Sequence, residues 1–195
     1  KDDLDMSAHK LMKFEVYVTF SEVSLEPTKT NMFIDSYGYP FYNVDSYNKH
    51  LTLKTEKNRD LEFGLKMKSE LFDVKINGFF MNMNNEILSS GSVTAIGSVT
   101  GYSVNKSQRV GLEVESKYVW NILQGGINFS HQNSKYWATT VSDYKTPLLS
   151  PNEILYVYQG VSYKGFKAEL SYQFVSSSLL NTNNTPILKT DPVNL

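Results

Sequence analysis

The chain has 195 residues and a formal net charge of −1, and its aromatic residues are 13 Tyr and 11 Phe against 2 Trp. The balanced charge and the lack of any Lys/Arg-rich run exclude an electrostatic case for nucleic-acid binding. There is no cysteine, which excludes disulfides, Cys-based zinc sites and thiol catalysis, and no apolar stretch reaches the roughly 20 residues of a membrane helix.

Seven segments alternate apolar and polar side chains with the period of two that predicts β-strands. In chain order they are residues 11–21, 59–68, 71–83, 107–120, 122–133, 154–163 and 166–176. In the first segment, for example, Phe14, Val16 and Val18 share one face and Glu15 and Tyr17 the other. Most segments are longer than the five or six residues usual in soluble domains. They match the roughly nine to eleven residues that a tilted membrane strand needs.

The connections between the predicted strands alternate in length. Three of them are tight turns, and the others are long segments rich in Ser, Asn, Thr, Gly and Tyr, at about residues 22–58, 84–106 and 134–152. Short turns at one end and long polar loops at the other are typical of outer-membrane barrels. We therefore predict an all-β, antiparallel transmembrane β-barrel, with its polar face toward a wet lumen and its apolar face toward lipid. A half-exposed antiparallel sheet in a soluble protein would show the same alternation.

Four segments then resemble, in order and spacing, the TonB-dependent outer-membrane receptor family. Residues 53–66 (LKTEKNRDLEFGLK) resemble the family signature L-K-P-E followed by E-x-G-L-+, with Thr55 where proline is usual. Residues 79–87 (FFMNMNNEI) resemble its F-Y-x-x-x-x-N-x-I strand end, and residues 105–115 (NKSQRVGLEVE) its N-x-G-x-x-x-x-G-x-E-x-E strand, with Ser107 in place of a frequent glycine. Residues 20–22 (FSE), with Pro27 shortly after, are similar to the Y-S-x-x-F-+-x-P element.

This resemblance implies a fragment of a 22-stranded barrel, with residues 1–195 forming one partial β-barrel domain. An N-terminal plug and further terminal strands are expected outside this sequence, because seven strands cannot close such a barrel. The resemblance also implies a receptor in the outer membrane of a Gram-negative bacterium, which imports a ferric siderophore or another metal chelate. Its expected partners are that ligand, outer-membrane lipid, and the TonB complex acting through the plug.

Receptors of this family often line their ligand-binding site with aromatic residues. The resemblance therefore implies that aromatic residues of the long connections are candidate ligand-binding residues. They are Tyr37, Tyr39, Tyr42, Tyr47, His50, Tyr136 and Trp137. Loop packing or anchoring at the membrane interface would explain the same aromatic residues. Histidine is a usual axial ligand of haem, but the sequence around His50 matches the family's haem receptors poorly, so a surface histidine is the preferred interpretation.

Two alternatives to a TonB-dependent importer remain from the sequence. One is a passive porin-like or adhesin-like barrel, and the other is a soluble secreted β-domain that binds carbohydrate through Tyr-rich loops. Enzymatic activity is not expected, because the chain carries no G-x-S-x-G elbow, H-E-x-x-H motif or P-loop. We accordingly predict no catalytic residues, no metal site and no cofactor.

Overall fold

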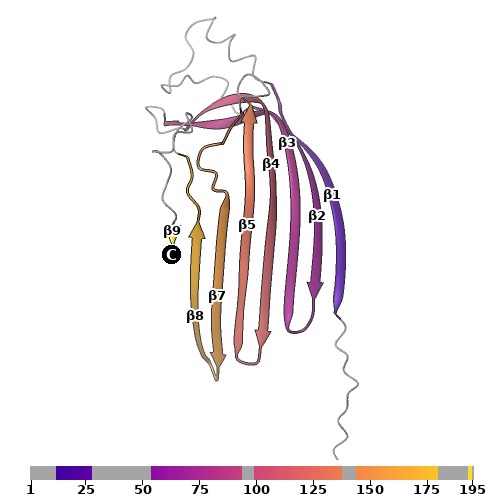
Figure 1. Cartoon of the computed structure of the whole chain (residues 1–195), viewed down its shortest axis with the longest axis vertical. Coiled ribbons are helices and arrows are strands. Elements are labelled where there is room, and N and C mark those ends of the chain that lie inside the picture. The colour runs from indigo at the N-terminus through magenta and orange to yellow at the C-terminus, as the bar shows by residue number, and fades with distance from the viewer. Residues whose placement is uncertain (1–11, 28–53, 94–98, 138–143, 180–192, 195) are drawn as a thin grey trace, which may run out of the picture.

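The fold is one antiparallel β-sheet, described by a computed structural model for residues 12–27, 54–93, 99–137, 144–179 and 193–194. The strands are β1 (Lys13–Leu25), β2 (Glu56–Lys68), β3 (Phe72–Val93), β4 (Val99–Trp120), β5 (Leu123–Trp137), β6 (Tyr144–Lys145), β7 (Glu153–Tyr163), β8 (Phe166–Val175) and β9 (Val193–Asn194). Their order in the sheet is β1-β2-β3-β4-β5-β7-β8-β9, with β6 paired to β5. Figure 1 shows the long strands side by side in a single layer. Within the described ranges, no helix has the length and hydropathy to cross a membrane.

All seven predicted strands are confirmed, but the prediction of a long loop at residues 84–106 is wrong. The β3–β4 ladder instead continues through Ser89, which pairs with Gly101, and ends on Val93 and Val99. In the same way, β5 runs on to Trp137, beyond the predicted end at residue 133. Antiparallel pairing needs only backbone hydrogen bonds, so a ladder can extend through a polar segment that lacks the apolar alternation.

Three short turns join neighbouring strands at one end of the sheet, which we call the short-turn end (Figure 1). In the first, the Ser69 hydroxyl oxygen accepts hydrogen bonds from the amides of Leu71 and Phe72, at 3.2 and 3.1 Å. The last turn is Lys164-Gly165, with φ of 45° and 87°, which is the pair of positive values that a two-residue type I′ hairpin requires. The opposite end is called the long-connection end below.

One face of the sheet, called the outer face below, is mainly apolar, with the exception of His131, Asn133 and Glu153 on the upper parts of β5 and β7. Directly paired residues share a face, and one paired row crosses seven strands as Val16, Leu65, Ile76, Val114, Phe129, Leu155 and Phe174. Side chains on this face are open to the surroundings: Phe20 is 68% and Leu170 79% exposed. The buried hydrophobic residues of the described ranges are few, namely Met83, Leu88, Val104, Tyr136 and Leu179. The described sheet therefore has no core behind its apolar face, as expected of a face that meets lipid.

This apolar face forms a band of limited height. On β4 the band extends from Val110 to Trp120, a span of roughly 33 Å along the strand, or about 25 Å across a membrane for a strand tilted by about 40°. Above the band, toward the long-connection end, the next paired row is polar: Glu22, Arg59, Asn82, Gln108 and Lys135. At the short-turn end the band finishes with aromatic residues on the same face, namely Tyr118, Trp120, Tyr163 and Phe166. An apolar band with an aromatic border is typical of a transmembrane barrel wall.

The inner face is polar and hydrogen-bonded across strands. The Tyr17 ring lies over Gly64, where an added Cβ would overlap it. Its hydroxyl donates to Asn77 Oδ1 at 3.0 Å, and the Asn77 amide nitrogen donates to Glu62 at 3.4 Å. Lys66 reaches back from β2 to Glu15 of β1 at 2.8 Å. The polar sides of β1, β2 and β3 are thus joined by side-chain contacts from strand to strand.

Candidate functional site

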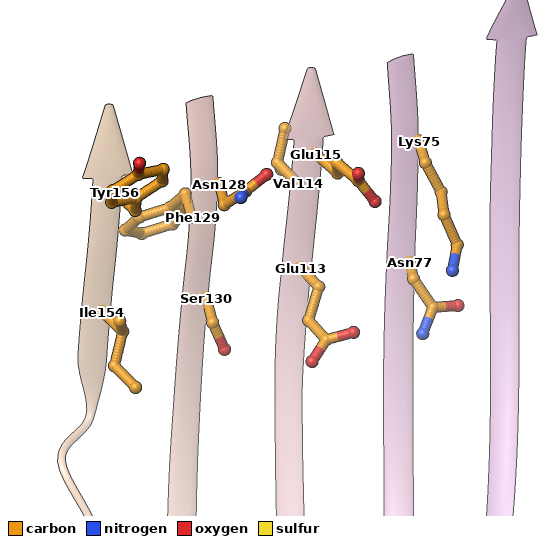
Figure 2. Close-up of a pocket in the computed structure, with 10 residues that line it drawn as sticks. All are labelled: Lys75, Asn77, Glu113, Val114, Glu115, Asn128, Phe129, Ser130, Ile154 and Tyr156. Carbon is orange, nitrogen blue, oxygen red and sulfur yellow. The ribbon is translucent and has the colours of Figure 1, made fainter. Parts of the chain in front are cut away.

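The inner face contains a shallow concavity of about 330 Å³, built by four neighbouring strands (Figure 2). Its polar lining comes from β3 (Lys75, Asn77), β4 (Glu113, Glu115), β5 (Asn128, Ser130) and β7 (Tyr156). Period-two alternation places Glu113 and Glu115 on this side together, and the β3–β4 register sets Lys75 directly opposite Glu115. Opposite charges facing each other across a ladder stabilise the wall without a reactive centre.

The chemistry of this concavity is that of a hydrogen-bonding surface. Within the described part of the chain, no group of three or more His, Asp or Glu side chains is arranged to hold a metal ion. The Glu115 carboxylate is paired with the Lys117 ammonium at 2.6 Å. The concavity can therefore contact a polar polypeptide or a solvated ligand.

A second feature is the upper arm, residues 84–93 of β3 and 99–106 of β4, which bends away from the line of the lower strands (Figure 1). On a regular strand, residues on one face are an even number of positions apart. Here the buried residues Met83 and Glu86 on β3 are three positions apart, and so are the buried residues Val104 and Ser107 on β4. Asn85, between the two β3 positions, has a φ of 58°, in the left-handed region that asparagine tolerates better than most residues. This local twist turns the next residues of both strands toward the inner face.

At the base of the upper arm lies a charged cluster that is largely withdrawn from solvent. The Glu86 side chain is 8% exposed and accepts short hydrogen bonds from the Arg109 guanidinium and the Ser107 hydroxyl. The Arg109 side chain, 25% exposed, also lies 2.8 Å from the Met83 sulfur through its Nη1 atom. Hydrogen bonds to both carboxylate oxygens compensate the burial of the Glu86 charge. The cluster therefore holds the twist between the lower ladder and the upper arm.

Beyond the charged cluster, the upper arm packs on β5 through a small apolar cluster. Leu88, Val104 and Tyr136 are buried together, with Tyr102 against them. The Tyr102 and Tyr136 rings meet edge to face, with centroids 6.0 Å apart and an interplanar angle of 64°. Tyr102 lies above the apolar band, and burial, with the hydrogen bond to Tyr136, raises the pKa of its hydroxyl well above the ordinary value.

The structure separates the two predicted ligand-binding residues that it describes. Tyr136 is 3% exposed and packs in the apolar cluster of the upper arm. Trp137, the next residue, points to the opposite face, where the Lys106 ammonium lies 5.1 Å from its ring. Both belong to β5, although they were predicted to lie in a loop. The remaining predicted residues, Tyr37, Tyr39, Tyr42, Tyr47 and His50, lie outside the described residues.

Sequence reasoning missed the cluster of Glu86, Ser107 and Arg109. The available signal was an interruption of the alternation, because Met83, Glu86 and Leu88 cannot share one face of a regular strand. The Asn84-Asn85 pair at that interruption was a further signal, since asparagine is favoured where φ is positive.

Asn85 provides a direct test of the twist. Replacing it with alanine is expected to destabilise the upper arm by roughly 1 kcal/mol, because a left-handed conformation is costly for a residue with an ordinary Cβ. Asn85→Gly should be neutral or slightly stabilising in conformation, although it also removes the Asn85 side-chain hydrogen bond to the Thr55 carbonyl. Hydrogen exchange of the arm amides in the two variants measures the difference. Equal exchange in Asn85→Ala and the unchanged protein would contradict the role assigned to the positive φ.

A single-layer antiparallel sheet with a lipid-facing apolar band, a polar inner wall and short turns at one end defines the wall of a transmembrane β-barrel. The family described as "TonB dependent receptor-like, beta-barrel" matches residues 13–195. The chain belongs to this family, and its fold is a fragment of the family's β-barrel domain.

Solved structures agree on the fold. The chain resembles the copper transporter OprC with 14% identity and a TM-score of 0.70, covering 93% of this chain and 28% of that one. It resembles the FrpB iron transporter from Neisseria meningitidis (F3-3 variant) with 11% identity and a TM-score of 0.56, covering 96% of this chain and 29% of that one. The chain thus spans less than a third of either transporter. A search of curated proteins gives no match.

Proposed function

We propose that residues 1–195 form part of the barrel wall of a TonB-dependent importer in the outer membrane of a Gram-negative bacterium. The cargo is proposed to be a ferric siderophore or another metal chelate, captured at the long-connection end and released inward by TonB acting through a plug elsewhere in the protein. In this arrangement the short-turn end faces the periplasm. The wall itself carries out no reaction.

The observation that carries this proposal is the family match across residues 13–195, together with the polarity of the two faces. A lipid-facing band on one side and a layer of polar contacts on the other suit a wide barrel with a plug against its inner wall. The named structural neighbours are a copper and an iron transporter, which favours a metal-containing cargo.

We test the function with the full-length protein expressed in a host that lacks its own siderophore receptors. Cells that contain TonB and cells that lack it are each given a panel of ferric siderophores labelled with radioactive iron, and a set of copper chelates. We expect saturable uptake of at least one metal chelate that stops when TonB is deleted. Uptake of many small solutes at rates independent of TonB would instead identify a passive porin and overturn the proposal.

The predicted aromatic residues of the long-connection end are proposed to line or support the ligand-binding surface. Among the described ones, Tyr136 supports it by packing in the apolar cluster of the upper arm, and Tyr136→Ala is therefore expected to weaken chelate binding. Trp120→Ala, at the short-turn border of the apolar band, is the control that should leave binding unchanged. Equal effects of both substitutions on binding would contradict this role for Tyr136.

A further inference from the structure

The outer face becomes cationic immediately above the apolar band, toward the long-connection end. Two consecutive paired rows on this face contain Lys57, Arg59, Lys106 and Lys135, drawn from β2, β4 and β5. The only acidic residue in the same two rows of these ladders is Glu22 on β1. We call the four basic residues the cationic collar. Because they lie on adjacent rows of one face, they form a single belt along the edge of the band.

Most of the positive charge in the cationic collar has no anionic partner in the part of the chain that the structure describes. Arg59 is paired with Glu22 at 2.7 Å. Lys57, Lys106 and Lys135, in contrast, have no carboxylate within ion-pair distance among the described residues. Lys106 and Lys135 lie over the rings of Trp137 and Tyr144, at 5.1 and 4.4 Å from the ring centroids. These contacts fix the direction of the two ammonium groups along the outer face without neutralising their charge.

The charge is specific to this border and this face. The inner face carries both signs in alternation, as in the pairs Lys66–Glu15 and Lys117–Glu115. The opposite border of the band carries aromatic side chains such as Trp120 and Phe166 in place of a belt of cations. A barrel wall that is cationic only where it leaves one leaflet is complementary to a membrane whose two leaflets differ in anionic charge.

We propose that the cationic collar binds the phosphate groups of lipid headgroups in the leaflet at the long-connection end. The assignment of that leaflet to the cell exterior rests on the proposed function, but the charge complementarity does not. Lys57 and Lys106 are two strands apart, or roughly 10 Å, which is wide enough for each ammonium to meet a different phosphate. The apolar band directly below holds the acyl chains of the same lipids. The collar therefore fixes the height of the barrel in the membrane and surrounds it with anionic lipid.

The experiment uses the full-length receptor in neutral detergent micelles and no cargo, so that its failure is distinct from a failure of the transport proposal. Its unfolding temperature is followed as phosphatidic acid, a phosphate monoester lipid, is added, with phosphatidylcholine as the uncharged reference and inorganic phosphate as the free anion. The test variant carries Lys57→Gln, Lys106→Gln and Lys135→Gln. The control variant carries Lys13→Gln, Lys164→Gln and Lys167→Gln, which remove the same charge near the short-turn end.

We expect phosphatidic acid to raise the unfolding temperature of the unchanged receptor and of the control more than phosphatidylcholine does. The collar variant should bind phosphatidic acid more weakly by on the order of 100-fold at low salt, because each lysine near an anionic surface contributes about a fivefold gain in affinity. The preference should also shrink as salt is added. Equal responses to the two lipids, or an unchanged response in the collar variant, would overturn the proposal. A response to inorganic phosphate as large as to phosphatidic acid would assign the collar to a free anion and overturn the lipid assignment.

Discussion

Leu112→Arg is expected to destabilise the assembled barrel by about 1 to 2 kcal/mol, because an arginine on the lipid-facing side of a membrane strand costs about 2 to 4 kcal/mol at the middle of the bilayer and less toward its borders. Leu112 is 42% exposed and lies on the outer face one row inside the upper border of the band, paired with Gly78 on β3 and His131 on β5. On a soluble sheet, an arginine at a side chain this exposed would change stability little. The substitution therefore separates a lipid-facing band from a solvated one.

The matched control is Gln108→Arg, four residues away on the same strand and face but in the polar row above the band. It adds the same side chain and charge where water and headgroups are available, so we expect a cost near zero. Denaturant unfolding of both variants in lipid vesicles measures the difference, with the mobility of unheated and boiled samples on gels as a check of barrel assembly. Equal stability of the two variants would contradict the assignment of the outer face to lipid.

The strands themselves could be predicted from the sequence because the membrane imposes a strict pattern on them. Val16, Val18 and Phe20 on β1, for example, all face lipid, and this repeated demand for apolar side chains at every second position produces the alternation that predicts the strands. The prediction weakened where that constraint ends. Above the apolar band both faces of the ladder tolerate polar side chains. The sequence of β3 between residue 84 and Val93 therefore lacks the apolar alternation that would distinguish a strand from a loop.

The base of the upper arm could not be predicted for a different reason. The Glu86 carboxylate meets Arg109 only because Asn85 turns one strand and the neighbouring strand follows, and this depends on pairing between residues more than 20 positions apart. Composition likewise made Tyr136 and Trp137 equivalent aromatic candidates, although consecutive residues of a strand point to opposite faces. One of them became part of a buried cluster and the other part of the outer surface.

Arg109→Met is expected to destabilise the upper arm by about 3 to 5 kcal/mol, the usual cost of removing one partner of a buried ion pair. The substitution leaves the Glu86 carboxylate 8% exposed with the Ser107 hydroxyl as its remaining hydrogen-bond donor among the described side chains. The cost should appear as local opening, because the arm packs through few buried side chains. Hydrogen exchange of amides 84–93 and 99–106 in the full-length receptor should therefore accelerate by on the order of 100-fold or more, until opening is complete.

The companion variant Glu86→Gln with Arg109→Met distinguishes the buried charge from the loss of arginine packing. With no unpaired carboxylate left, exchange of the upper arm should recover most of its protection, since replacing both members of a buried pair is far less costly than replacing one. The exposed pair Arg59–Glu22 serves as the control, and Arg59→Met should leave exchange of the arm unchanged. Exchange in the double variant as fast as in Arg109→Met would show that arginine packing holds the arm. Slow exchange in the double variant would instead show that the unpaired Glu86 charge, and not the lost arginine packing, opens the arm in Arg109→Met.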